Sequence, residues 1–191
     1  GFLKSPLSAE QVGELLDYLK GRSLRNYAIV NLIIRTGLRT IEVSRLDVGD
    51  IVFRRGKRVL LVWGKGMSSK DSLVILNDPA WEPIRDYLAT RKGVKHGDPL
   101  FVTDGKGHRG ARLSTRSVQD ICKQALRAIG LDSHEFSAHS LRHTTAVWIL
   151  RSGGDMKAVQ RVLRHSSAVT SQIYTETVEE EIMLDRNPEA L

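Results

Sequence analysis

The spacing of apolar and polar residues predicts a mainly helical chain. Ser8 and Gln11 can form a capping box at the start of a first helix, and apolar residues follow at helical spacing. A second helix is predicted from about Ser23 through "LRNYAIVNLIIRT", with Gly37 in the place of a left-handed C-terminal cap. The segment "RTIEVSRL" then begins another, short helix.

Three short runs of β-forming residues follow these helices. They are "IVF" at 51 to 53, "VLLVW" at 59 to 63 and "SLVIL" at 72 to 76. The segments between them, "RRGK" and "GKGMSSKD", have the composition of turns. Because short turns join antiparallel neighbours, the pattern predicts a small three-stranded antiparallel β-sheet.

The second half of the chain is predicted to be helical. Asn77 or Asp78 caps one helix, and Ser114 opens another that ends before Gly130, with a loop between them at 102–113. The remaining helices are expected from 137 to 152, over "MKAVQRVLRH" after its Asp155 cap, and around Tyr174. The predicted fold class is therefore mainly α with one small sheet.

Composition narrows the class of protein. A chain of 191 residues with 41% hydrophobic and 27% charged residues has the make-up of a soluble globular domain. It has no apolar run of eighteen residues, and "GFLKSPLSAEQ" lacks the features of a signal peptide, so we expect a cytoplasmic protein. Cys122 is the single cysteine, which excludes an internal disulfide and a cysteine-based zinc cluster.

Charge is distributed unevenly along the chain. The net charge is +7, yet the residues from Glu176 onward hold six acids and one base, so residues 1–175 carry +12. A basic body favours a polyanionic partner, most commonly nucleic acid. The alternative is a generally basic, solvated surface without such a partner.

One predicted helix begins with a cluster of basic side chains. His139, Arg142 and His143 are spaced i, i+3 and i+4 and can share one face. Two such imidazoles could bind zinc, but no Glu follows the first and no carboxylate partner is evident, so no metal cofactor is expected. An imidazole beside a guanidinium can instead bind phosphate oxygens, which leaves His143 as a structural residue.

Three further cations could contact an anion. Arg39 follows a helix-terminating glycine and starts the next helix, a favourable place for binding an anion. Lys65 lies in a "GKG" turn between two predicted strands, which would hold its ammonium group in place. Lys106 lies in a second "GKG" within a longer loop, where it is either flexible or in contact with a DNA backbone.

Four motifs in order, "TGLRTIEV", the first "GKG", "SAHSLRHTTA" and "LRHSSAVTSQIYTE", resemble the motif set of the tyrosine recombinase family, the lambda-integrase and Xer type. The likeness extends from about Leu7 to Thr177. It implies the DNA breaking-rejoining catalytic-domain fold for residues 8–177. It also implies that residues 1–7 are the linker that follows the N-terminal DNA-clamping domain of relatives.

The resemblance also implies a set of site residues around a scissile phosphate: Arg39, Lys65, His139, Arg142, His165 and the nucleophile Tyr174. Glu42 matches the acidic position that supports the first arginine. Arg164 stands where relatives usually have glycine, so its charge either enters the site or points outward. Lys106 and Arg164 are therefore candidate DNA contacts.

The implied reaction is site-specific DNA recombination. Tyr174 would form a 3′-phosphotyrosine link and release a 5′ hydroxyl, with Lys65 as the acid, His139 as the candidate base and neither ATP nor a cofactor. Ionising a phenol at pH 7 costs roughly 4 kcal/mol, so a base or a cationic field must assist. A type IB topoisomerase and a non-catalytic DNA-binding protein of the same fold are the alternatives.

The acidic tail, residues 178–191, carries Val178, Ile182 and Met183 at helical spacing. Relatives dock such a tail on a neighbouring protomer, which implies exchange within a DNA-bound homotetramer. The alternative is a tail folded back on its own domain. The expected partner is double-stranded DNA at a specific site, in a nucleoid-associated protein.

Overall fold

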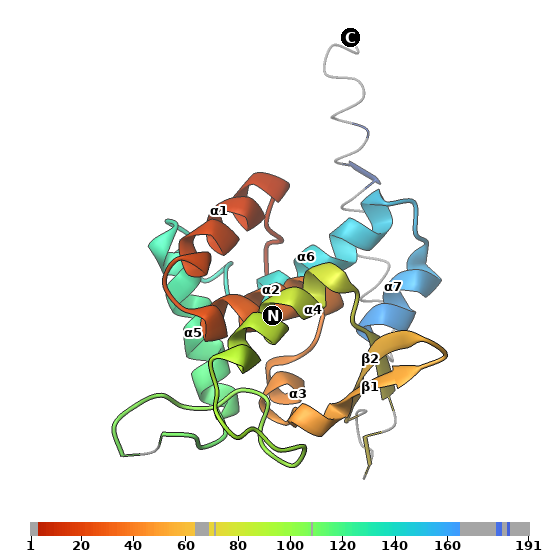
Figure 1. The fold of residues 1–191 in the computed structure, drawn as a ribbon. Coiled ribbons are helices and arrows are strands. Elements are labelled where there is room, and N and C mark those ends of the chain that lie inside the picture. Colours follow the sequence, from red (N-terminus) through yellow and green to blue (C-terminus); the bar gives the residue numbers. More distant parts are fainter. Residues whose placement is uncertain are drawn as a thin grey trace.

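The structure is a computed structural model, and it describes residues 4–63, 69–70, 72–107, 109–164, 179–180 and 183. Figure 1 shows helices gathered around a central helix, with a small sheet at one side. The elements in chain order are α1 (Ala9–Lys20), α2 (Leu24–Thr36), α3 (Thr40–Ser44), the 3-10 turn η1 (Val48–Asp50), β1 (Ile51–Arg54), β2 (Lys57–Val62), β3 (Ser72–Ile75), α4 (Asp78–Ala89), α5 (Thr115–Ala128), α6 (Ala138–Arg151) and α7 (Met156–Leu163). The predicted mainly helical class is confirmed.

The first two helices begin where their capping residues predict, and the second also ends at its predicted glycine cap. Ser8 Oγ accepts from the Gln11 amide at 3.1 Å, and the Ser8 amide donates to Gln11 Oε1 at 3.0 Å. Helix α2 starts after Ser23 and ends at Gly37, whose φ of 71° is left-handed. The chain can therefore turn sharply between α2 and α3, which places Arg39 at the N-cap of α3.

Helix α2 is the centre of the hydrophobic core. Its residues Ile29, Leu32 and Ile33 are buried, and the helix packs against α1, α4 and α6 (Figure 1). Burying each such side chain contributes roughly 1.5–3 kcal/mol before the entropy cost. The core thus holds α2 in place, and the turn at Gly37 is held at the end of this fixed helix.

The sheet has the strand order β1-β2-β3 with both pairs antiparallel, so the predicted meander is confirmed. Arg55 and Gly56 both have positive φ in the tight β1–β2 turn, as the right-handed twist of a hairpin favours. Leu60, paired with Val74, faces the core, whereas Ile75, paired with Val59, is exposed. The sheet therefore packs on the helices mainly with the face that carries Leu60, and on the other face Val59 is buried as well.

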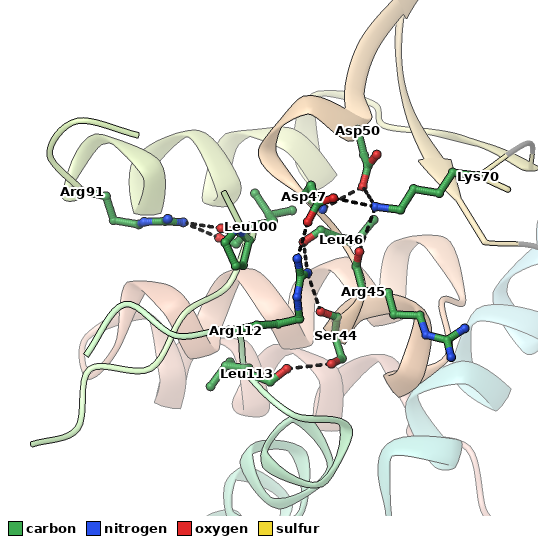
Figure 2. A network of polar contacts seen from close by, with 11 residues as sticks. Ser44, Arg45, Leu46, Asp47, Asp50, Lys70, Arg91, Leu100, Arg112 and Leu113 are labelled. Atoms are coloured by element: carbon green, nitrogen blue, oxygen red, sulfur yellow. Dashed lines mark hydrogen bonds and ion pairs between the residues drawn. The ribbon is translucent and has the colours of Figure 1, made fainter. Parts of the chain in front are cut away.

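Arg112 holds the segment that follows α3. Its Nη1 donates to the carbonyls of Ser44 and Leu46 at 3.0 Å each, and its Nη2 donates to Asp47 at 2.5 Å. Ser44 Oγ also donates to the Leu113 carbonyl at 2.7 Å. Figure 2 shows these bonds joining the end of α3 to the loop before α5.

Lys70 holds the same segment from the side of the sheet. Its Nζ donates to the Arg45 carbonyl at 3.0 Å, to Asp47 at 2.9 Å and to Asp50 at 2.6 Å (Figure 2). Burial alone would raise the pKa of Asp47, but hydrogen bonds from Arg112 and Lys70 hold it below its ordinary 3.8. The carboxylate stays charged at neutral pH, so the short helix α3 is fixed at its C-terminal end.

Helix α7 ends earlier than its sequence pattern predicts. The pattern extended it through His165, but the helix ends at Leu163, and Arg164 adopts a left-handed φ of 54°. The Arg164 amide donates to the Gln160 carbonyl and closes the last turn. Leu163 is buried against Gly37, so the end of α7 packs on the turn between α2 and α3.

No helix in the described part of the chain has both the length and the apolar character needed to cross a membrane.

Gly37→Ala should lower the free energy of unfolding by about 2–4 kcal/mol. The substitution forces a left-handed φ on a residue with a Cβ, at about 1–2 kcal/mol, and that Cβ would overlap the Leu163 side chain, which adds about 1–2 kcal/mol. Gly56→Ala is the matched control, because Gly56 has a φ of 77° and open space around it. Urea denaturation should show the larger loss for Gly37→Ala. Equal losses would mean that the contact with Leu163 adds nothing.

Candidate active site

Three of the predicted site residues line one pocket. Arg39 comes from the N-cap of α3, and His139 and Arg142 come from the first turns of α6. The pocket has a volume of about 450 Å³ and is closed on its third side by the start of α5. The fold thus brings together residues that are about a hundred positions apart in the chain.

Arg142 is the most buried of these residues, with 6% of its surface exposed. Its Nη1 donates to the Gly37 carbonyl at 2.5 Å, and its Nη2 donates to the Leu163 carbonyl at 2.6 Å. Burial and the neighbouring guanidinium groups of Arg39 and Arg164 lower its pKa to about 9, so it still carries its proton at neutral pH. Arg142 therefore brings a fixed positive charge to the pocket and joins the ends of α2 and α7.

Arg39 faces the pocket from α3. Its backbone amide donates to Glu42 Oε1 at 2.8 Å, while its guanidinium Nη1 lies 3.7 Å from that oxygen, beyond hydrogen-bond distance. The Arg39 side chain is 32% exposed, so solvent or a ligand can reach it. Its forked donors can therefore turn toward an anion in the pocket.

Glu42 is a buried carboxylate behind the pocket, with 5% of its surface exposed. Its nearest cation is Arg164, whose Nη2 lies 2.5 Å from Oε1. The sequence left open whether Arg164 points inward or outward, and the structure has it pointing inward, with a side chain that is 15% exposed. Arg164 lies behind the pocket and does not line it.

His139 is surrounded by cations. Burial lowers its pKa below the ordinary 6.5, and the charges of Arg142, Lys4 and Arg39 lower it further. The imidazole is therefore neutral at pH 7 and able to accept a proton. His143, which the sequence assigned a structural role, is half-buried and does not line the pocket.

The start of α6 adds backbone donors to the same pocket. Ser137 is the N-cap, and its Oγ accepts from the His139 amide at 3.3 Å. The positive end of this fourteen-residue helix thus lies beside Arg142 and His139. A helix N-terminus favours an anion, so its field has the same sign as the side chains.

Helix α5 forms a wall of the pocket that was not predicted. Arg116 and Lys123 both line the pocket, the first paired with Asp120 at 3.2 Å and the second donating to the Phe136 carbonyl at 2.8 Å. The two cations are seven residues apart, which places them on one face of a helix. This spacing indicates a shared basic face on α5, but the pocket that the face lines is set by tertiary packing.

The other predicted site residues have different places. Lys106 is exposed in the loop before α5 and does not line the pocket. Lys65, His165 and Tyr174 lie outside the described residues, so their predicted roles stay predictions. Within the described ranges, no three His, Cys, Asp or Glu side chains are grouped so that they could hold a metal ion.

Comparison with known proteins relates this chain to a family. The chain is 38% identical over 175 residues to the tyrosine recombinase XerC of Actinobacillus pleuropneumoniae, and 36% identical over 175 residues to that of Corynebacterium glutamicum. These alignments cover 91% and 88% of this chain but 55% and 53% of the relatives. The chain thus spans about half the length of the curated relatives it matches.

Solved structures share the fold. The crystal structure of XerA recombinase has a TM-score of 0.78 at 27% identity, covering 98% of this chain and 67% of that one. XerH site-specific recombinase bound to palindromic difH substrate, at 23% identity, covers 97% of this chain and 53% of that one with a TM-score of 0.77. The recombinase fold that the four motifs predicted is therefore confirmed.

The match to the family itself extends over nearly the whole chain, from residue 6 to residue 181. It includes the described pocket residues Arg39, His139 and Arg142, together with Glu42 and Arg164 behind them. With this extent, the chain belongs to the phage integrase family.

Proposed function

We propose that this chain is the catalytic part of a site-specific DNA recombinase that cuts and rejoins strands through Tyr174. The observation that carries the proposal is the joining of Arg39, His139 and Arg142 at one pocket. The relatives named tyrosine recombinase XerC support it at the level of the family. Residues 8–177 are proposed as the catalytic unit.

The charge of the pocket suits a phosphodiester. As a nucleophile attacks, negative charge increases on the non-bridging oxygens, and fixed cations directed at them lower the barrier. Arg142 is held by two backbone carbonyls, so its orientation is set before DNA binds. Arg39 adds donors from a second helix, and His139 adds a neutral imidazole from the helix turn that also carries Arg142.

The proposed step forms one bond and breaks one. The Tyr174 phenolic oxygen bonds to phosphorus, its proton passes to the neutral imidazole of His139, and the bond from phosphorus to the 5′ oxygen breaks. Lys65 protonates the departing 5′ oxygen. Attack by the 5′ hydroxyl of a partner strand reverses these transfers and restores the phenol, so ATP is not consumed.

The proposed partner is double-stranded DNA containing a specific site. The +12 charge of residues 1–175 favours association with its phosphates, and the solved XerH complex is described as bound to its difH substrate after cleavage. We propose that four protomers assemble on DNA and that residues 178–191 pass to a neighbour. Val178, Ile182 and Met183 would supply the apolar contacts of that exchange.

The covalent intermediate is the direct test of this proposal. The 191-residue chain is incubated with a library of nicked duplexes that carry a randomised core, and adducts that survive denaturing washes are sequenced. The duplex recovered in this way should give a covalent adduct with the chain, and Tyr174→Phe should reduce the yield at least about 10³-fold, because removing a nucleophile removes the covalent route.

The matched control is Tyr27→Phe, which removes the same hydroxyl from α2 at a distance along the chain from the site residues. It should retain the adduct yield. An adduct that forms equally well with Tyr174→Phe would remove Tyr174 from the reaction. Relaxation of supercoiled plasmid by a monomer, without strand exchange, would favour the topoisomerase alternative.

The pH dependence of adduct formation should report His139. A base must be neutral, and the lowered pKa of His139 predicts that kcat/KM falls only below about pH 6.5, as the imidazole of the free protein protonates. Lys4→Gln, which removes one neighbouring cation, should move this fall to higher pH. Rates of adduct formation at subsaturating DNA measure both profiles. If a His139→Gln variant shows the same fall of kcat/KM at low pH, His139 is not the base.

Deleting residues 178–191 should abolish the tetrameric complex on DNA while leaving single-site binding within about threefold, because exchanged contacts stabilise only the assembly. Native gel mobility and light scattering on a duplex with paired sites measure the assembly. Unchanged tetramer formation would instead support a tail folded on its own domain.

A further inference from the structure

We infer that Arg164 is a positioning residue of the phosphate site, which acts through Glu42 to keep Arg39 available for the anion. This inference rests on the function proposed above. Its starting point is a single oxygen, Glu42 Oε1, which receives the Arg39 amide at 2.8 Å and Arg164 Nη2 at 2.5 Å. The Arg39 guanidinium is the third group near this oxygen, with Nη1 at 3.7 Å from it.

The backbone of Arg164 is held in a conformation that arginine rarely adopts. Its φ of 54° is left-handed, where a Cβ clashes with the following carbonyl. Its side chain is largely buried, and its Nε has no hydrogen-bond partner among the described residues. Both features cost free energy, and such strain persists where surrounding contacts enforce it. The short bond to Glu42 is the contact that compensates here.

The charge balance of the cluster depends on Arg164. Arg39, Arg142 and Arg164 lie around one carboxylate, so the cluster carries a net charge of +2 when all four groups are ionised. A phosphodiester carries one negative charge, and a pentacoordinate transition state concentrates a second on its oxygens. Without Arg164 the cluster would carry a net charge of +1. Less positive charge would then stabilise the additional negative charge of the transition state.

The geometry of Arg39 depends on Arg164 as well. Glu42 is buried and cannot remain charged without a cation nearby. If Arg164 is removed, the Arg39 guanidinium is the remaining cation within 4 Å of that carboxylate among the described residues. It would then close the distance of 3.7 Å to form the hydrogen bond itself, and would turn away from the pocket.

The test compares Arg164→Gln with Arg161→Gln. Both changes remove one guanidinium from α7 or its cap, but Arg161 is exposed and does not line the pocket. Cleavage is followed in single turnover at saturating concentrations of the duplex recovered above, with either a phosphodiester or a neutral methylphosphonate at the scissile position. Arg164→Gln should slow cleavage of the phosphodiester about tenfold, less than the loss of a direct donor, and should leave the half-saturating DNA concentration unchanged.

The methylphosphonate separates an electrostatic role from a structural one. Because it lacks the charged oxygen, the defect of Arg164→Gln on this substrate should shrink to about twofold. Arg164→Lys, which keeps the charge, should recover part of the phosphodiester rate. The double variant Glu42→Gln with Arg164→Gln should be faster than Arg164→Gln alone, since a neutral amide at position 42 no longer attracts Arg39. The Arg161→Gln variant should match the unmodified chain on both substrates.

An equal defect of Arg164→Gln on both substrates, or no rescue in the double variant, would overturn the inference. A crystal structure of Arg164→Gln gives a readout that does not depend on activity. The distance from Arg39 Nη1 to Glu42 should fall from 3.7 Å to hydrogen-bond length, and an unchanged distance would overturn the inference too. Failure of the unmodified chain to form any adduct would count against the proposed recombinase function, while the Arg39–Glu42 distance would still decide this point.

Discussion

The arrangement of the site depends on the two hydrogen bonds that Arg142 donates to backbone carbonyls. The Gly37 carbonyl belongs to the turn that leads into α3, and the Leu163 carbonyl belongs to the last residue of α7. One buried guanidinium therefore fixes two segments that are far apart in the chain. A lysine could not reproduce this, because its single ammonium cannot span both carbonyls in a planar fork.

Further contacts fix the same two segments against one another. Leu163 fills the space beside Gly37, which caps α2, and Arg164 bonds Glu42, which lies in α3. The end of α7 therefore contacts both the turn that ends α2 and the helix that follows it. Arg112 and Lys70 hold the chain at the C-terminal end of α3. The short helix α3, with five residues, has little stability of its own, and these contacts supply its position.

Local sequence signals predicted the elements well. Capping residues such as Ser8, Ser114 and Asp155 mark helix starts because the bonds that they make are local. The family motifs implied one site for Arg39, His139 and Arg142, and these three residues line one pocket, while their roles in it stay predictions. The early end of α7 was not predicted, because it is made by a left-handed Arg164, a conformation that residues other than glycine rarely adopt. The bond from its side chain to Glu42, more than a hundred residues earlier, is likewise invisible to a local pattern.

The same limit applies to the pocket walls and to the segment after α3. The pairing of Arg112 with Asp47, and the approach of Lys123 to the pocket, arise from tertiary packing that no local pattern encodes. Arg116 and Lys123 share a helix face, yet the sequence does not say which face is turned toward α6. Roles that depend on Lys65, His165 and Tyr174 remain predictions from the motifs.

The buried cysteine of α5 has a practical consequence. Cys122 has no exposed surface, and burial raises the pKa of its thiol to about 12. Thiol reagents act on the exposed thiolate, so this residue is protected in the folded chain. Because the sequence holds one cysteine, a second one introduced at a surface position would be a unique attachment point for a fluorophore. The natural chain is therefore suited to single-molecule observation without removal of its own thiol.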